Sequence, residues 1–151
     1  MVIEVGELTD LLLLLVTMRE LGEVAGRTRL QKMIYLLRER FGVPFRLKFK
    51  PYFYGPYSDE LSDIVENLVA LGLIEEHRRY LADGVVEYSY KLTDAGSGFL
   101  ETQVISETLR KPQLTNLLKG VRELRGLPTN TLITTAKSIL AGLVVPSQRD
   151  N

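Results

Sequence analysis

The chain has 151 residues, of which 45% are hydrophobic, and its 19 basic and 19 acidic side chains cancel to zero net charge. A chain of this size fits one compact domain, and zero net charge leaves no overall field that would draw it to nucleic acid or to a membrane. Because the sequence has no cysteine and one histidine, it excludes disulfides, cysteine nucleophiles and zinc–thiolate sites, and we expect neither a metal nor a cofactor.

The first predicted element is a helix over residues 6–21, which Gly22 ends. It contains the apolar run LLLLLV at residues 11–16, far shorter than the roughly 20 residues of a membrane-spanning helix. Three acidic residues precede the run, whereas a signal peptide starts with basic ones. We therefore expect a buried helix in a cytoplasmic protein that does not enter a membrane. Leucines on so many faces further predict that a second copy covers part of this helix, so we expect a homodimer.

A second helix is predicted over residues 27–41, because apolar residues recur three and four positions apart and Gly42 follows. Residues 43–54 then alternate between apolar and basic side chains, the period-two pattern of an extended strand. The apolar positions are Phe45, Leu47 and Phe49, and the basic ones are Arg46, Lys48 and Lys50. Pro51 limits this segment to the edge of a sheet.

A third helix begins after Ser58, a favourable N-cap, with Asp59 and Glu60 at the positive end of its dipole. Its predicted buried stripe consists of Leu61, Ile64, Val65, Leu68 and Leu71. Two strand-like runs over residues 77–81 and 85–92 flank an Asp-Gly step, which strongly predicts a β-hairpin. Thr93 and Asp94 cap a fourth helix over residues 95–110, and two more helices follow Pro112 and Pro128.

Three helices, a two-stranded hairpin and a further helix, in this order, are typical of a winged helix-turn-helix. We therefore predict an α+β fold that is mostly α, with the hairpin as its wing and additional C-terminal helices. The predicted winged-helix domain covers residues 1–110. Residues 111–145 form a C-terminal helical extension packed on this domain or between subunits, and residues 146–151 form a frayed tail.

Two motifs, LQKMIYLLRERFG and YFYGPYSDEL, place Leu-Gln-Lys and Tyr on one helix and a tyrosine-Gly-Pro step before the next. Through them, residues 28–72 resemble the Panacea domain of the SocA-like antitoxin superfamily, and in particular its YwgA-like branch. The matching residues are Gln31, Lys32, Tyr35, Tyr54, Gly55 and Pro56. The resemblance implies a non-enzymatic domain that often neutralises a toxin by direct contact, sometimes as an adaptor that delivers it to a protease.

The acidic third helix disfavours the usual mode of DNA reading, in which the helix before the wing enters the major groove. Between Pro51 and His77 there are six carboxylates and no Lys or Arg, so this surface would repel a polyanion. A basic surface elsewhere stays open as an alternative, because residues 27–50 hold eight basic residues and one acidic residue. The candidate nucleic-acid contacts are Arg27, Arg29, Lys32, Arg46, Lys48 and Lys50, with Arg78 and Arg79 before the turn of the wing. The same side chains are equally compatible with ordinary solvated faces.

Four aromatic rings crowd the Gly-Pro step, at Tyr52, Phe53, Tyr54 and Tyr57, and they cannot all point inward. Gly55 and Pro56 can simply orient the third helix, but exposed tyrosines are also favoured anchors at protein interfaces. The predicted partner-binding residues are Tyr52, Tyr54, Tyr57, Asp59, Asp63 and Glu66. The sequence therefore predicts a regulatory module that binds a protein partner, such as a toxin. The alternative is a DNA-binding transcription regulator that uses residues 27–50 and the wing.

No pattern points to catalysis. The GSG at residues 96–98 lies in a predicted helix and lacks the Lys-Ser/Thr of a phosphate-binding loop. His77 has no evident nucleophile near it in the sequence, so we expect no enzyme.

Overall fold

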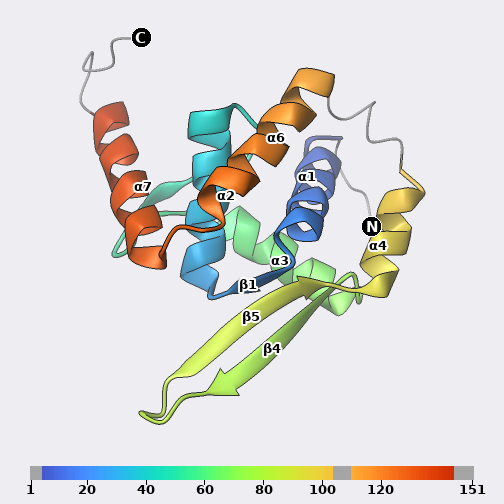
Figure 1. The fold of residues 1–151 in the computed structure, drawn as a ribbon, viewed down its shortest axis with the longest axis horizontal. Helices are drawn as coiled ribbons and strands as arrows, with labels where there is room; N and C mark the ends of the chain where they lie inside the picture. Colours follow the sequence, from blue (N-terminus) through green and yellow to red (C-terminus); the bar gives the residue numbers. More distant parts are fainter. Residues whose placement is uncertain (1–4, 104–109, 145–151) are drawn as a thin grey trace.

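The computed structural model describes residues 5–103 and 110–144 (Figure 1). Its elements are α1 (Val5–Leu21), β1 (Glu23–Ala25), α2 (Arg27–Phe41), β2 (Lys50–Tyr52), β3 (Gly55–Tyr57), α3 (Asp59–Ala70), β4 (Ile74–Tyr80), β5 (Val86–Leu92), α4 (Asp94–Glu101), α6 (Lys111–Leu124) and α7 (Thr129–Val144). The described part of the chain is thus an α+β fold with six helices, as predicted. The tail at residues 146–151 lies outside the described residues.

Three strands form an antiparallel sheet in the order β1-β5-β4. The predicted hairpin is confirmed, with Ile74 opposite Leu92 at its base and Tyr80 opposite Val86 near its turn. This hairpin extends away from the helices, as Figure 1 shows. Strand β1 was not predicted, because it has only three residues and its partner lies far along the chain, with Val24 opposite Tyr90.

The strand predicted over residues 43–54 is wrong in its bounds, because pairing starts only at β2, which forms a short antiparallel hairpin with β3. The alternation itself is confirmed: Phe45 and Leu47 are buried, whereas Arg46 and Lys48 are exposed. Carboxylates take the place of a neighbouring strand here. The backbone N–H of Arg46 donates to Asp10 Oδ1 (2.7 Å), and that of Lys48 donates to Glu60 Oε1 (3.0 Å).

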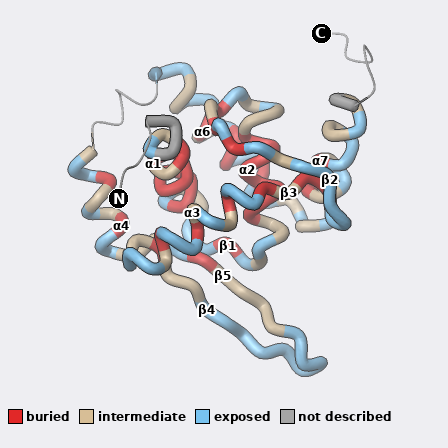
Figure 2. The backbone as a smooth tube through the Cα atoms, turned by 180° about the vertical axis from the view of Figure 1, so that it is seen from behind, coloured by how far each residue is buried: buried red, intermediate tan, exposed pale blue. Residues whose placement is uncertain are grey.

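Helices α1 and α2 form the centre of the hydrophobic core, drawn in red in Figure 2. Residues 12–16 of α1 are at most 4% exposed within a single chain, since α4, α6, β1 and β5 pack against this helix. The reason for expecting a second copy on this helix is therefore wrong. Helices α6 and α7 add Leu117, Leu124, Leu132 and Ala136 to the same core.

The predicted ends of the helices are largely confirmed. Gly22 and Gly42 follow α1 and α2 with positive φ angles, and the Ser58 hydroxyl accepts from the N–H of Leu61 (3.1 Å). Leu71 was wrongly placed in the buried stripe of α3: the helix ends at Ala70, and Leu71 is 59% exposed. Pro112 lies in the first turn of α6, where proline is tolerated because its missing N–H has no helical partner anyway.

None of the helices in the described ranges is long and apolar enough to cross a membrane.

Candidate functional site

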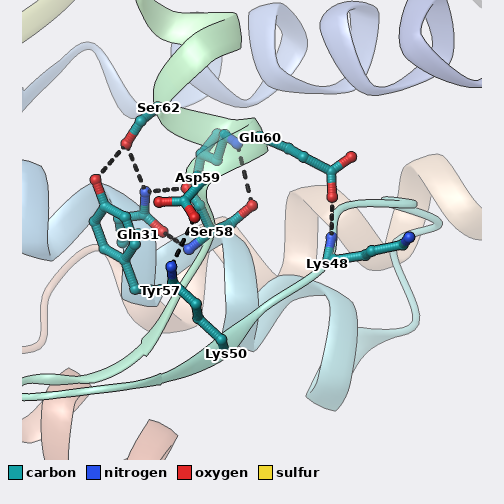
Figure 3. Close-up of polar contacts among 9 residues, drawn as sticks. Gln31, Lys48, Lys50, Tyr57, Ser58, Asp59, Glu60 and Ser62 are labelled. Atoms are coloured by element: carbon teal, nitrogen blue, oxygen red, sulfur yellow. Dashed lines mark hydrogen bonds and ion pairs between the residues drawn. The ribbon is translucent and has the colours of Figure 1, made fainter.

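A buried glutamine fixes the start of the acidic helix α3. Gln31 of α2 is 3% exposed, and its Oε1 accepts from the backbone N–H of Ser58 (2.8 Å). Its Nε2 donates to the carbonyl of Ser58 (2.9 Å) and contacts Ser62 Oγ (3.3 Å), as drawn in Figure 3. The Tyr57 hydroxyl shares a 2.6 Å hydrogen bond with the same Ser62 hydroxyl. Gln31 thus positions both the β2–β3 hairpin and α3, so this motif residue has a structural role.

Three adjacent aromatic rings lie exposed at the turn between β2 and β3. Tyr52 is 56% exposed, Phe53 81% and Tyr54 61%, and we call these three residues the aromatic rim. The Tyr52 ring lies 5.3 Å from that of Phe53 and 5.4 Å from that of Tyr57. Tyr57 is half-buried, and its hydroxyl is engaged with Ser62, so it supports the rim more than it extends it. Phe53, the most exposed ring, was not among the predicted binding residues, although its place in the four-ring cluster could have suggested it.

The motif residues Gly55 and Pro56 are buried beneath this rim. Gly55 has a φ of +99°, a conformation that L side chains rarely adopt, and it packs against α2 and α7. A short hairpin anchored in this way presents the three rings on a fixed support.

The predicted acidic residues Asp59, Asp63 and Glu66 are all exposed on α3. Asp59 pairs with Lys50 of β2 at 2.7 Å, which ties the start of α3 to the hairpin. In that pair, the hydrogen bond and the charge of Asp59 raise the pKa of Lys50. Asp63 and Glu66 have no ion pair to any described residue, so their charges are available to a partner.

A hollow of about 100 Å³ lies between α2, α3 and the sheet. Its polar lining includes Arg27, Gln31, Tyr57, Ser62, Glu66, Glu76 and Tyr90. Tyr57 connects this hollow with the aromatic rim, because it lines the hollow and packs against Tyr52. The rim, the hollow and the acidic face therefore adjoin one another.

Arg27 is held firmly at the edge of the hollow. Its Nε donates to the Tyr90 hydroxyl (2.8 Å), its Nη2 lies 3.6 Å from Glu76, and its guanidinium stacks 3.9 Å from the centre of the Tyr88 ring. The bond to Tyr90 raises the pKa of Arg27, and burial raises the pKa of Tyr90 to about 12. Tyr90 therefore stays a neutral hydroxyl near pH 7, and Arg27 stays charged.

Two of the predicted nucleic-acid contacts are not free surface cations, because Arg29 is hydrogen-bonded within the fold and Lys32 is buried. Arg29 donates through Nη1 to the carbonyl of Leu127 (2.7 Å) and through Nη2 to that of Arg125 (2.8 Å), which fastens the loop between α6 and α7. Lys32 is only 2% exposed, so its prediction as a surface cation is wrong. Its burial next to β3 depends on α7, a helix whose position in the fold the sequence could not predict.

The remaining basic residues are divided among separate surfaces. Arg78 lies 3.8 Å from Glu76, and Arg79 lies 2.6 Å from Glu87 on the paired strand. Only the side chains of Arg46 and Lys48, among the predicted cations in the described part, are exposed without an ion pair or hydrogen bond there. The structure therefore does not bring the predicted set together as one basic surface.

Tyr35, another motif residue, is 1% exposed, and its ring packs edge-on against that of Phe49, with the ring centres 5.1 Å apart. Arg38 lies 4.9 Å from the centre of the Phe49 ring, and its Nη1 donates to the carbonyl of Leu47.

No pattern in the sequence indicated that Asp10 would accept the backbone N–H of Arg46. This carboxylate is 5% exposed, and burial raises its pKa while the Arg46 N–H stabilises its charge.

These features define a small α+β protein in which exposed rings and carboxylates lie on neighbouring elements. In the parts of the chain that the structure describes, no group of three or more His, Asp or Glu residues is arranged to hold a metal ion.

No family model matches the chain. Over 80 residues, or 53% of its length, the chain is 44% identical to the uncharacterized protein YwgA of Bacillus subtilis (strain 168). The match covers 47% of that protein, so the chain spans about half the length of the curated relative it matches. The similarity to a YwgA protein is therefore confirmed over this part, and membership of the Panacea superfamily stays a prediction.

Proposed function

We propose that this chain is a non-enzymatic regulatory module of the winged-helix, antitoxin-like type, which binds a protein partner through the aromatic rim and the acidic face of α3. In this proposal the β4–β5 hairpin is the wing, and the fold belongs to the Panacea superfamily that residues 28–72 resemble. The observation that carries the proposal is the exposure of three adjacent rings, at 56%, 81% and 61%, on an anchored hairpin.

The proposal is supported physically by the binding free energy that a partner would gain by covering the exposed rings. Contiguous exposed apolar surface of this kind usually marks an interaction site, and tyrosines are enriched among the residues that dominate binding. Because Gly55 and Pro56 fix the hairpin, little conformational entropy is lost when a partner covers the rings.

Charge complementarity indicates the chemistry of that partner. Asp63 and Glu66 are exposed and unpaired among the described residues, whereas six of the eight predicted cations are buried or have partners within the chain. The fitting partner is therefore a protein that presents an apolar depression flanked by Lys or Arg side chains. Opposite charges of this kind also accelerate association.

The test is a binding measurement on a purified partner that the wild-type chain captures. Phe53→Ala and Tyr54→Ala should each weaken the complex by about 2 kcal/mol, a roughly 30-fold rise in Kd, because each removes a ring that the partner covers. Replacing Asp63 and Glu66 with Lys should weaken it further and mainly slow association.

Two matched controls accompany these variants. Tyr80→Ala removes a ring that is 73% exposed on the β4–β5 hairpin, and Glu123→Lys reverses an exposed charge on α6. Both should bind as the wild type does. Equal binding by the rim variants and by these controls would contradict the proposal.

A second candidate function is DNA binding, which the β4–β5 hairpin favours: it extends away from the helices (Figure 1), and its residues Arg78 and Arg79 are exposed. If the hairpin and residues 27–50 contact phosphates, affinity should fall with salt, and Arg46→Ala with Lys48→Ala should lower the salt slope by about one per lost contact. The Asp63 and Glu66 reversal would then tighten DNA binding. Absence of binding to duplex and single strands at low salt would exclude this candidate.

A further inference from the structure

Lys32 is a buried lysine for which the described residues supply no partner. It lies in the middle of α2 and is 2% exposed, although lysine is rarely so buried unless it is paired. Its ammonium makes no hydrogen bond or ion pair with any residue that the structure describes. Neither the fold nor the proposed docking face uses this charge.

A second cation approaches the same point from another helix. A Cβ atom added to Gly55 would lie 3.5 Å from Lys32 Cε and 3.2 Å from Lys137 Cγ. The side chains of Lys32 from α2 and Lys137 from α7 therefore meet at the backbone of β3. The carbonyl of Ile133 lies at the same place, 3.9 Å from that Cβ position.

The two lysines repel each other, and burial removes much of the water that would otherwise weaken this repulsion. Desolvation, and then the charge of Lys137, lower the pKa of Lys32 to about 8. Among the described groups, Lys137 is the one charged residue that acts on Lys32; α7 also contributes the Ile133 carbonyl, and β3 contributes the Gly55 backbone. Lys32 thus stays mostly protonated near pH 7, and a negative group between the two lysines would relieve an unfavourable arrangement.

We propose that Lys32 and Lys137 form a binding site for one oxyanion group, a carboxylate or a tetrahedral oxyanion, at the base of the β2–β3 hairpin. The buried lysine supplies a charge whose attraction is weakly screened, and the exposed Lys137 supplies a mobile second contact. Because residue 55 is a glycine, both lysine side chains can lie this close to its backbone, where a Cβ would crowd Lys137. This inference stands independently of the proposed protein partner.

Sulfate is the probe for the test, because its charge stays constant over the pH range in which Lys32 titrates. In protein labelled with ¹³C-lysine, sulfate added at constant ionic strength should shift the Lys32 and Lys137 resonances in a saturable way. Bound sulfate should raise the pKa of Lys32. Above pH 8 the affinity should fall about tenfold per pH unit, as Lys32 loses its proton.

Three variants identify the site. Lys32→Met and Lys137→Met keep an apolar stem without the charge, and each should weaken sulfate binding at least tenfold at pH 7. Lys119→Met, an exposed lysine on α6, should bind as the wild type does. Acetate that competes with sulfate assigns the site to carboxylates as well, and acetate that does not compete restricts it to tetrahedral oxyanions.

The pH dependence of stability shows whether Lys32→Met folds normally. The folded pKa of Lys32, about 8, lies below the ordinary lysine value of 10.5, so between these values the unfolded chain binds more protons. Stability therefore rises with pH in this window, and the penalty from Lys32 is present in full below pH 8. Lys32→Met should melt higher than the wild type at pH 7, and this advantage should shrink toward pH 10. Sulfate shifts that do not saturate, or equal sulfate affinity in the wild type and in Lys32→Met, would overturn the proposal.

Discussion

At the scale of single residues, the Gln31 and Tyr35 positions of the sequence motif have a mainly structural role. Gln31 and Tyr35 are buried and hold neighbouring elements, whereas the exposed rings belong to residues 52–54. Composition could predict the exposure, because four rings within six positions cannot all enter one core. It could not predict that Lys32 is buried, since this depends on α7, which is distant in the sequence.

The amide of Gln31 gives a direct test of this supporting role. Gln31→Met keeps the volume of the side chain but leaves the buried N–H of Ser58 without its acceptor, while the Ser58 carbonyl keeps the N–H of Ser62. An unsatisfied buried polar group costs about 1–3 kcal/mol, so the free energy of unfolding should fall by about 2 kcal/mol in urea denaturation.

The control for this variant is Gln103→Met, because among the described residues the Gln103 amide bonds to the neighbouring Thr102 hydroxyl alone. Its unfolding free energy should change by less than about 0.5 kcal/mol. Equal denaturation midpoints for both variants and the wild type would show that the Gln31 amide does not stabilise the start of α3.

At the scale of elements, periodicity and end signals predicted the helices well. Gly22, Gly42, Ser58 and Thr93 mark boundaries that the structure confirms, because capping depends on adjacent residues. Strand β1 was not predicted and the bounds of β2 were wrong, because such short strands form only through pairing with a partner strand. Residues 43–49 look like a strand, but carboxylates from α1 and α3 bind the N–H groups of Arg46 and Lys48.

Helix α4 contains two glycines two positions apart, of which Gly96 is closely packed and Gly98 faces open space. A Cβ on Gly96 would lie 2.2 Å from the carbonyl oxygen of Leu73 and 2.6 Å from Leu92 Cδ1, whereas one on Gly98 would meet no atom within 4 Å. Gly96→Ala should therefore push α4 away from the sheet and lower the free energy of unfolding by about 3 kcal/mol. Gly98→Ala should stabilise the protein by about 0.5–1 kcal/mol, because alanine favours the helix more.

Thermal unfolding of these two variants checks the packing of α4, since the substitution and the helix are the same in both. The melting temperature should fall with Gly96→Ala and rise with Gly98→Ala. A change of the same sign in both variants would contradict the close contact between α4 and the β4–β5 sheet.

At the scale of the whole molecule, the N-terminal and C-terminal halves contribute to one hydrophobic core. Leu13 of α1 and Leu132 of α7 are both 0% exposed in the same cluster, and Arg29 joins α2 to the loop before α7. The sequence suggested a boundary near Pro112 because proline often breaks a helix, but local signals carry no information on which distant surfaces pack together. A shared core predicts that residues 5–103 and 110–144 unfold as one unit.

Substitutions at the two ends of this core test that prediction. Leu13→Ala and Leu132→Ala each remove a buried side chain and should cost about 2–5 kcal/mol, depending on how far the site collapses. Leu71→Ala is the control, because Leu71 is 59% exposed and its loss should cost less than about 0.5 kcal/mol. In one cooperative unit, Leu132→Ala lowers the protection of the slowest-exchanging α1 amides by the same free energy that it removes from global unfolding. Amide hydrogen exchange measures this directly. If α1 protection stayed at the wild-type level in Leu132→Ala while protection in α7 fell, the C-terminal helices would be a separate folding unit.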